Sequence, residues 1–416
     1  YSMIRRTIQS RQKPAAGLVR IEEMVNYFSY SYPEPDDAAF SVSADTAGAP
    51  WDGSHRLVRI GLKGRNVQLA KRPSSNLVFL LDTSGSMEAA DRLPLVKQSM
   101  ALLVEQLDER DSVAIVAYAG SSGLVLPATP GNQKQKILDA FDRLSAGGST
   151  NGGQGIQLAY ETAAKAFIQG GTNRVILATD GDFNVGVTGK GALEELIQQK
   201  AKSGVFLSVL GFGTGNTKDA TMETLADKGN GNYAYIDGLA EAKKVLVDQM
   251  GGTLITVAKD VKIQVTFDPK TVQSYRLIGY ENRVLAHEDF NDDKKDAGEI
   301  GANHRVTALY DIVPAKGAGK GSRYGKIALR FKEPDGVTSR LVETNVEDSG
   351  TSFESATTDF RFAASVAGFG MLLRGSKYAG DLSYDQVESM AKASVGDDPD
   401  GHRKEFVSLV RSMKEL

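Results

Sequence analysis

The chain of 416 residues has a formal net charge of −3 and contains no cysteine, which excludes disulfides, thiolate metal sites and cysteine nucleophiles. Hydrophobic residues make up 41% and charged residues 24%, a composition typical of a folded globular protein and not of a disordered chain. The small net charge gives no indication of binding to nucleic acid or to an anionic membrane. No apolar run approaches the roughly 18 residues that a membrane-spanning helix needs. The length itself favours about two to four domains.

The first part of the chain, residues 1–36, is expected to be a helical segment. Between residues 20 and 28, apolar side chains recur at positions 21, 24, 25 and 28, which is the spacing of one helix face. The chain begins at Tyr1 without a signal-like segment, so we expect any secretion signal or lipid-attachment cysteine to precede it.

Residues 37–75 contain two strand-like runs, at 40–44 and 57–62. Two strands cannot form a stable sheet alone, because a sheet needs three or more strands or a packed face. We therefore expect these runs to join strands that lie later in the chain.

Residues 76–250 alternate strand-like and helix-like segments, which predicts an α/β domain with a doubly wound, mainly parallel sheet. Strands are predicted at 76–82, 112–118, 123–127, 174–179, 205–211 and 233–236. Helices are predicted at about 92–107, 133–144, 153–168, 191–203, 219–228 and 240–250. The close pair 112–118 and 123–127 is typical of a hairpin, which would add one antiparallel edge strand.

Residues 251–350 show no helical pattern and are expected to form a β-sandwich. The strand-like runs are 253–258, 261–267, 275–279, 304–311, 324–331 and 339–345. If the strands of 37–75 complete this domain, the α/β domain is inserted between strands of the sandwich. Residues 351–416 are again predicted to be helical, at 357–373, 384–391 and 403–413.

One carboxylate and two hydroxyls follow the first apolar strand of the α/β domain. The run 76–81 is continuously apolar after Asn76, and it is followed by Asp82-Thr83-Ser84-Gly85-Ser86. Ligands bind at the carboxyl ends of such strands, and hard oxygen donors suit Mg2+. An ordinary turn with a serine cap is an equal alternative for this pentapeptide alone.

Two later segments favour the metal site over the turn. Thr150 lies in a glycine-rich loop that opens a helical pattern, and Asp180 directly follows a second buried-strand run, 174–179. With Asp82, Ser84, Ser86, Thr150 and Asp180, the chain resembles the von Willebrand factor type A (vWA) family with its metal-ion-dependent adhesion site. The resemblance covers about residues 75–250.

The resemblance implies a role for each motif residue. Ser84 and Ser86 would donate hydroxyl oxygens directly to the metal, and Thr150 would bind directly or through water. Asp82 and Asp180 would mostly hold metal-bound waters. An acidic side chain of a protein ligand would fill the open coordination position of Mg2+ or Mn2+.

The flanks narrow the resemblance to bacterial cell-envelope vWA proteins, often lipoproteins. The residues concerned are 19–28, 296–302 and the tail 403–407. The architecture is also distantly similar to inter-α-trypsin inhibitor heavy chains.

Other candidate sites are weaker. Asp289, Asn291 and Asp293 have the spacing of a calcium loop, but its sixth and twelfth positions are Lys294 and Ile300 where glycine and glutamate are needed. Asp182 is a candidate for a water-mediated role beside Asp180, and a solvent-facing loop acid is the simpler alternative. The Gly-x-Ser-x-Gly elbow, the phosphate loop and the His-Glu-x-x-His motif are all missing from the sequence.

We therefore expect a non-enzymatic, Mg2+-dependent protein-binding module of the bacterial envelope, whose partner presents an Asp or Glu. The alternative is an intracellular vWA subunit that tethers a substrate or partner to an ATPase, as in a metal chelatase or an assembly machine.

Overall fold

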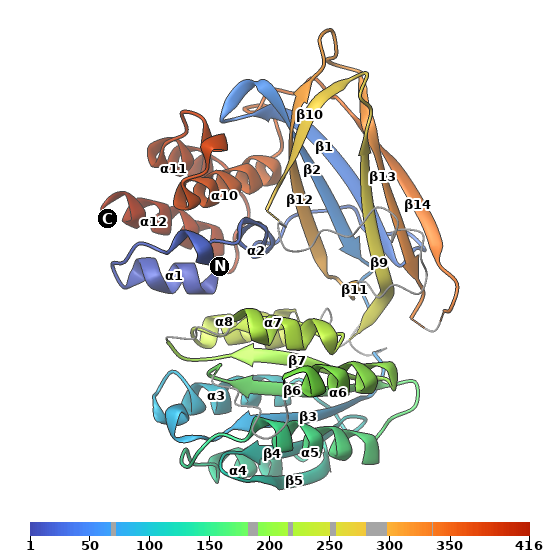
Figure 1. Ribbon diagram of the computed structural model, residues 1–416, viewed down its shortest axis with the longest axis vertical. Helices are drawn as coiled ribbons and strands as arrows, with labels where there is room; N and C mark the ends of the chain where they lie inside the picture. Colours follow the sequence, from blue (N-terminus) through green and yellow to red (C-terminus); the bar gives the residue numbers. More distant parts are fainter. Residues whose placement is uncertain (68–71, 182–189, 215–218, 250–254, 280–297, 335) are drawn as a thin grey trace. The chain divides into compact units, whose positions relative to one another are not determined.

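The computed structural model describes residues 1–416 apart from 68–71, 182–189, 215–218, 250–254, 280–297 and 335. The chain divides into two compact units (Figure 1). The central unit is Val67–Thr256, and the flanking unit combines Tyr1–Asn66 with Val257–Leu416. The flanking unit is thus built from both ends of the chain.

A six-stranded sheet with the order β5-β4-β3-β6-β7-β8 forms the middle of the central unit. Its strands are β3 (Ser75–Asp82), β4 (Ser112–Tyr118), β5 (Ser122–Pro130), β6 (Thr172–Thr179), β7 (Val205–Gly211) and β8 (Tyr233–Tyr235). All neighbours are parallel except β4 and β5, which pair antiparallel. The predicted hairpin and its antiparallel edge strand are therefore confirmed.

Helices cover both faces of this sheet (Figure 1). They are α3 (Leu93–Val104), α4 (Lys134–Asp142), α5 (Gly152–Lys165), α6 (Lys190–Lys202), α7 (Asp219–Lys228) and α8 (Leu239–Lys243). Val78 and Leu80 of β3 share one core cluster with residues of α5, α6 and α7. Phe79, which points to the other face of the strand, contacts Phe141 of α4 with ring centroids 5.7 Å apart. Because both faces are covered, every residue of β3 is buried, and this explains its continuous apolar sequence.

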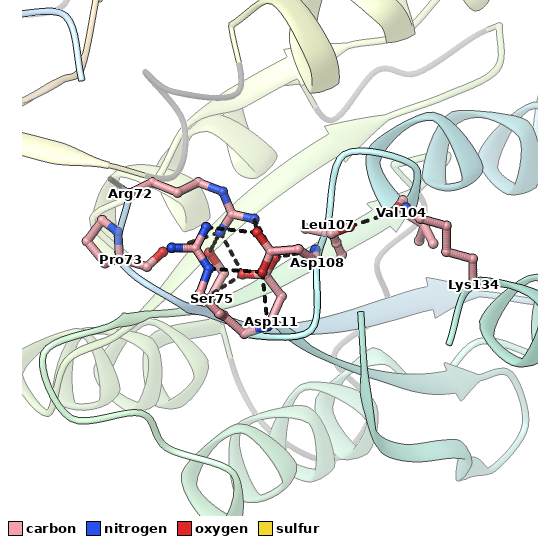
Figure 2. Close-up of polar contacts among 9 residues, drawn as sticks. Arg72, Pro73, Ser75, Val104, Leu107, Asp108, Asp111 and Lys134 are labelled. Carbon is pink, nitrogen blue, oxygen red and sulfur yellow. Dashed lines mark hydrogen bonds and ion pairs between the residues drawn. The ribbon is translucent and has the colours of Figure 1, made fainter. Parts of the chain in front are cut away.

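A buried ion pair joins β3 and β4 at the amino ends of these strands (Figure 2). Arg72 donates from Nη1 to Asp111 Oδ1 at 2.6 Å and from Nη2 to Asp111 Oδ2, and the two side chains are 3% and 0% exposed. Asp111 also accepts hydrogen bonds from the backbone N–H groups of Ser75 and Asp108, both at 2.9 Å. These contacts lie at the end of β3 opposite to Asp82, so the pair is structural and separate from the predicted metal site.

Two four-stranded sheets make up the β part of the flanking unit, with the orders β1-β2-β12-β10 and β11-β9-β13-β14. Their strands are β1 (Phe40–Ala49), β2 (Asp52–Gly64), β9 (Thr256–Phe267), β10 (Val272–Ile278), β11 (Gly298–Gly301), β12 (Arg305–Pro314), β13 (Arg323–Lys332) and β14 (Arg340–Glu347). Strand β2 pairs antiparallel with β12 from Lys63↔Arg305 to Arg56↔Ile312. The expectation that the early strands join later ones is confirmed by this register.

The structure differs from the sequence-based expectation in β11, which was not predicted, and in β9. Residues 253–258 and 261–267 were expected as two strands, but β9 is continuous from Thr256 to Phe267. Asp260 adopts a positive φ of 52°, and the pairing of β9 with β13 shifts register beside it. Aspartate tolerates this conformation better than most residues, so the polar interruption is an irregularity within a strand and not a turn.

Five α-helices of the flanking unit come from the two ends of the chain. They are α1 (Ser2–Gln9), α2 (Ile21–Asn26), α10 (Thr358–Arg374), α11 (Tyr384–Ala393) and α12 (His402–Lys414). One core cluster joins side chains of these helices to Leu57 of β2 and Leu309 of β12. The terminal helices therefore pack on the sheet that contains β1 and β2. Within the described residues, no helix is both long enough and apolar enough to cross a bilayer.

Candidate metal centre

The strand order of the central unit places the carboxyl ends of β3 and β6 at a topological switch point. From β3 the chain moves to β4 on one side, and from β6, which also neighbours β3, it moves to β7 on the other side. Asp82 is the last residue of β3, and Asp180 follows the last residue of β6. The two carboxylates therefore lie beside the crevice where ligands bind in open α/β sheets.

Asp82 is fully buried and held by three hydrogen bonds. Its Oδ1 accepts from the backbone N–H of Ser84 at 2.9 Å, and its Oδ2 accepts from the hydroxyls of Tyr118 and Thr179, each at 3.1 Å. Burial raises the pKa of Asp82 above its ordinary value of 3.8, and the negative charge of Asp180 adds to this, while the hydrogen bonds from Ser84 oppose it. A cation at this site would compensate the buried charge.

The hydroxyls of Ser84 and Ser86 converge, with their Oγ atoms 3.1 Å apart. Two neighbouring ligands of an octahedral Mg2+, each about 2.1 Å from the metal, are separated by about 3 Å. The spacing of these two oxygens therefore matches one edge of a magnesium coordination octahedron. Ser84 is buried and Ser86 is exposed, so the two hydroxyls lie at the boundary between the protein interior and the solvent.

The glycine-rich loop that carries Thr150 is bound to the serine loop through the backbone. Gly85 N–H donates to Gly148 O at 3.0 Å, and Gly147 N–H donates to Thr83 O at 2.8 Å. Thr150 lies two residues beyond Gly148, is half-buried, and forms no hydrogen bond with any described residue. The backbone contacts of Gly147 and Gly148 therefore hold the loop that carries Thr150 against the serine loop.

Arg92 is a residue of this site that the sequence reasoning missed. Its Nη1 donates to Asp180 Oδ2 at 2.7 Å and to Ser86 O at 2.5 Å, and its Nη2 donates to Thr214 O at 3.2 Å. The guanidinium thus bridges three loops at the carboxyl edge of the sheet. A Cβ on Gly213, whose φ is +80°, would lie 2.5 Å from Arg92 Nε, so this arrangement requires glycine there.

Hydrogen bonds and strand positions bring four of the five predicted ligands to one edge of the sheet: Asp82, Ser84, Ser86 and Asp180. Thr150 is brought there by its loop. Among the described residues, no group of three or more His, Cys, Asp or Glu side chains could hold a metal. The predicted set contains only two carboxylates, so this finding concerns a different kind of site. Asp182 and the Asp289–Asp293 segment lie outside the described residues.

Comparison with known proteins identifies the family. Residues 76–249 match the family model for the von Willebrand factor type A domain, residues 1–59 match one described as von Willebrand factor, and residues 252–416 match one described as Uncharacterized protein YfbK, C-terminal. The chain is 42% identical over 435 residues to Uncharacterized protein YfbK of Escherichia coli (strain K12), covering 99% of this chain and 75% of that protein. The chain belongs to the YfbK family of vWA proteins. The vWA resemblance drawn from the five motif residues is thereby confirmed.

More distant similarities cover parts of the chain or show the fold alone. The Magnesium-chelatase 60 kDa subunit of Rhodobacter capsulatus is 29% identical over 179 residues, 40% of this chain and 32% of that protein. Inter alpha-trypsin inhibitor, heavy chain 4 of Mus musculus is 26% identical over 149 residues, 34% of this chain and 16% of that protein. The solved structure of a von Willebrand factor type A protein from Catenulispora acidiphila has a TM-score of 0.52 at 15% identity, covering 90% of this chain and 89% of that one.

Proposed function

We propose that this YfbK-family protein is a non-enzymatic, Mg2+-dependent protein-binding module of the bacterial cell envelope. In this proposal the vWA module is inserted in a β-sandwich, and a lipid anchor upstream of Tyr1 attaches the protein to the membrane. The observation that carries the binding role is the pair of hydroxyls on Ser84 and Ser86, 3.1 Å apart beside a carboxylate whose two oxygens already accept protein hydrogen bonds.

The donor set favours an ion that still attracts an anion. Ser84, Ser86 and Thr150 would bind Mg2+ or Mn2+ through neutral hydroxyl oxygens, directly or, for Thr150, through water. Asp82 and Asp180 would act through metal-bound waters, because Asp82 is engaged by Ser84, Tyr118 and Thr179 and Asp180 by Arg92. With no direct carboxylate ligand from the chain itself, the metal keeps its affinity for a carboxylate of a partner.

A protein ligand with an exposed Asp or Glu fits this arrangement better than a small substrate. One metal–carboxylate contact is far smaller than a stable interface, which buries about 800 Å2 on each partner. The surrounding loops, at about 182–190 and 212–218, would supply most of that area. Both loops lie largely outside the described residues.

The test is affinity capture from an envelope extract. Wild-type protein is used with Mg2+ and with EDTA, Ser84→Ala is the site variant, and Ser203→Ala is the matched control. Ser203 is an exposed serine of the same unit that donates to Lys200 O after α6, away from the site. We expect partners to be recovered by wild type and Ser203→Ala with Mg2+ only. Recovery of the same partners by Ser84→Ala, or in EDTA, would refute the adhesive role.

A second candidate is an intracellular subunit that tethers a partner to an ATPase. The similarity to the Magnesium-chelatase 60 kDa subunit is the observation that favours it. In that case, the captured partner would be an ATPase from the soluble fraction. A neighbouring ATPase gene would agree with this reading, whereas a signal peptide with a lipid-attachment cysteine before Tyr1 would agree with the envelope role.

A further inference from the structure

Tyr118 lies at the carboxyl end of β4, directly beside Asp82 at the end of β3. The two residues are register partners in the parallel pairing of these strands. Tyr118 is fully buried, with 0% of its surface exposed. It is not one of the five motif residues, yet its hydroxyl, its backbone carbonyl and its side-chain carbons each contact a segment that carries or adjoins a predicted metal ligand.

The hydroxyl of Tyr118 holds the carboxylate of Asp82. It donates to Asp82 Oδ2 at 3.1 Å, and Thr179 Oγ1 donates to the same oxygen at 3.1 Å. Burial raises the pKa of Tyr118 well above its ordinary value of 10, and the negative charge of Asp82 adds to this, so the hydroxyl stays protonated and remains a donor. Two donors on one oxygen fix the orientation of the carboxylate, whose other oxygen accepts from the N–H of Ser84.

The backbone carbonyl of Tyr118 holds the start of the serine loop. Tyr118 O accepts from the N–H of Thr83 at 2.9 Å and from Thr83 Oγ1 at 3.1 Å. Thr83 lies between Asp82 and Ser84 in the chain. The same residue therefore fixes both the carboxylate at the end of β3 and the segment that leads to the two serine hydroxyls.

The side chain of Tyr118 and the turn after it contact the helix and the loop next to Thr150. A Cβ on Gly155 of α5 would lie 2.8 Å from Tyr118 Cβ, so the backbone of this helix packs directly on the side chain. Helix α5 begins two residues after Thr150. A Cβ on Gly120, two residues after Tyr118, would lie 3.2 Å from Ser149 Oγ. The end of β4 thus contacts the segment around Thr150 at two points.

We propose that Tyr118 is the positioning residue of the metal centre and sets its affinity for Mg2+. It does so by fixing Asp82, the serine loop and the Thr150 loop relative to one another. The inference rests on the proposed function, because it requires that the motif residues bind Mg2+. This ion demands near-ideal octahedral geometry, so a small displacement of one donor weakens binding. Residues that hold metal ligands through hydrogen bonds typically contribute about 10–100-fold to metal affinity.

The variant that tests the proposal is Tyr118→Phe, which removes only the hydroxyl. The packing against Gly155 and the hydrogen bonds from Thr83 to the carbonyl are kept. The matched control is Tyr160→Phe, which removes another tyrosine hydroxyl from the same core cluster. Tyr160 is 1% exposed, and its buried hydroxyl has no hydrogen-bond partner among the described residues.

The measurements are calorimetric titration of Mg2+ into the metal-free proteins and melting temperatures with Mg2+ and with EDTA. We expect Tyr160→Phe to bind Mg2+ as wild type does and Tyr118→Phe to bind it roughly tenfold more weakly or worse. Mg2+ should then raise the melting temperature of Tyr118→Phe by less than that of wild type. A merely structural role would lower the melting temperature equally in both buffers and leave the Mg2+ affinity unchanged.

The outcomes separate this inference from the proposed function. If wild type binds no Mg2+, the metal site is refuted and the positioning role with it. If wild type binds Mg2+ and Tyr118→Phe binds it equally well, only the positioning role is overturned. Equal weakening in Tyr160→Phe would overturn it too, because the effect would then follow from any buried hydroxyl. If Tyr118→Phe does not fold, Thr83→Val decides the result, since it removes a hydrogen bond to the Tyr118 carbonyl; unchanged Mg2+ affinity in that variant would overturn the proposal.

Discussion

Replacing Arg92 with alanine should destabilise the metal-free protein more than the Mg2+-bound protein. The Asp180 side chain is 4% exposed and its Arg92 partner 21% exposed, so the variant leaves a nearly buried carboxylate without this partner. A hydrogen bond to a charged group contributes about 1.5–3 kcal/mol, and the partial exposure of Arg92 places the loss toward the lower end. For a unit of this size, about 1.5 kcal/mol lowers the melting temperature by roughly 3–6 °C.

Mg2+ should recover most of this loss, because a cation at the site neutralises Asp180 in place of the guanidinium. Binding at a hundredfold excess over the dissociation constant adds about 2.7 kcal/mol to the stability of the folded state. We therefore expect Mg2+ to raise the melting temperature of Arg92→Ala by more than it raises that of wild type, as measured by scanning calorimetry with Mg2+ and with EDTA.

The matched control for this experiment is Arg110→Ala. Arg110 pairs with Asp108 in the same unit, but the two side chains are 40% and 38% exposed, so its removal should change the melting temperature little in either buffer. The reasoning is refuted if Mg2+ stabilises Arg92→Ala no more than wild type. That result would mean that Arg92 does not take the place of a cation beside Asp180.

Three further predictions follow from the fold and from the charges. Asp111→Ala should lower the free energy of unfolding by roughly 3–5 kcal/mol in denaturant titrations, because it leaves the buried guanidinium of Arg72 without its partner. The control Asp108→Ala should lower it by less than about 1 kcal/mol. Equal losses would contradict the structural role of the Arg72–Asp111 pair. A fragment of residues 72–252 should give a dispersed NMR spectrum and one of 253–416 should not, since the latter lacks β1 and β2; a dispersed spectrum from 253–416 would show these strands to be dispensable. In metal-free buffer, wild type should gain stability relative to Asp82→Asn as the pH falls from neutral toward 3.8. Over this range the folded state binds more protons than the unfolded state, because the pKa of Asp82 is raised in the folded state. The prediction is contradicted if the melting temperatures of the two proteins change in parallel with pH.

The sequence was sufficient to locate the metal-centre candidates because their signals are local. Strands β3 and β6 are covered on both faces and therefore appear as continuous apolar runs, and each ends directly at a motif aspartate. The pairing of β2 with β12 was also predictable, since two isolated strands cannot form a stable sheet.

Contacts between distant segments could not be predicted in this way. Arg92 reaches Asp180 across 88 positions of sequence, and nothing near Arg92 marks it as part of the site. Arg59 of β2 and Arg305 of β12 lie far apart in the sequence, on either side of the central unit, and only the pairing of β2 with β12 brings them into one sheet. The bulge at Asp260 likewise depends on pairing with β13, which continues the strand through a polar interruption.

The central claim, that the five motif residues form a magnesium site, is tested most directly by calorimetric titration of Mg2+ into the metal-free protein. Wild type should bind Mg2+, with Ca2+ the poorer ligand because so few oxygens converge at the site. Asp82→Ala and Ser84→Ala should show no saturable binding while keeping the circular dichroism spectrum of wild type, and Ser203→Ala should bind as wild type does. Equal binding of Mg2+ by wild type and Asp82→Ala would contradict the assignment.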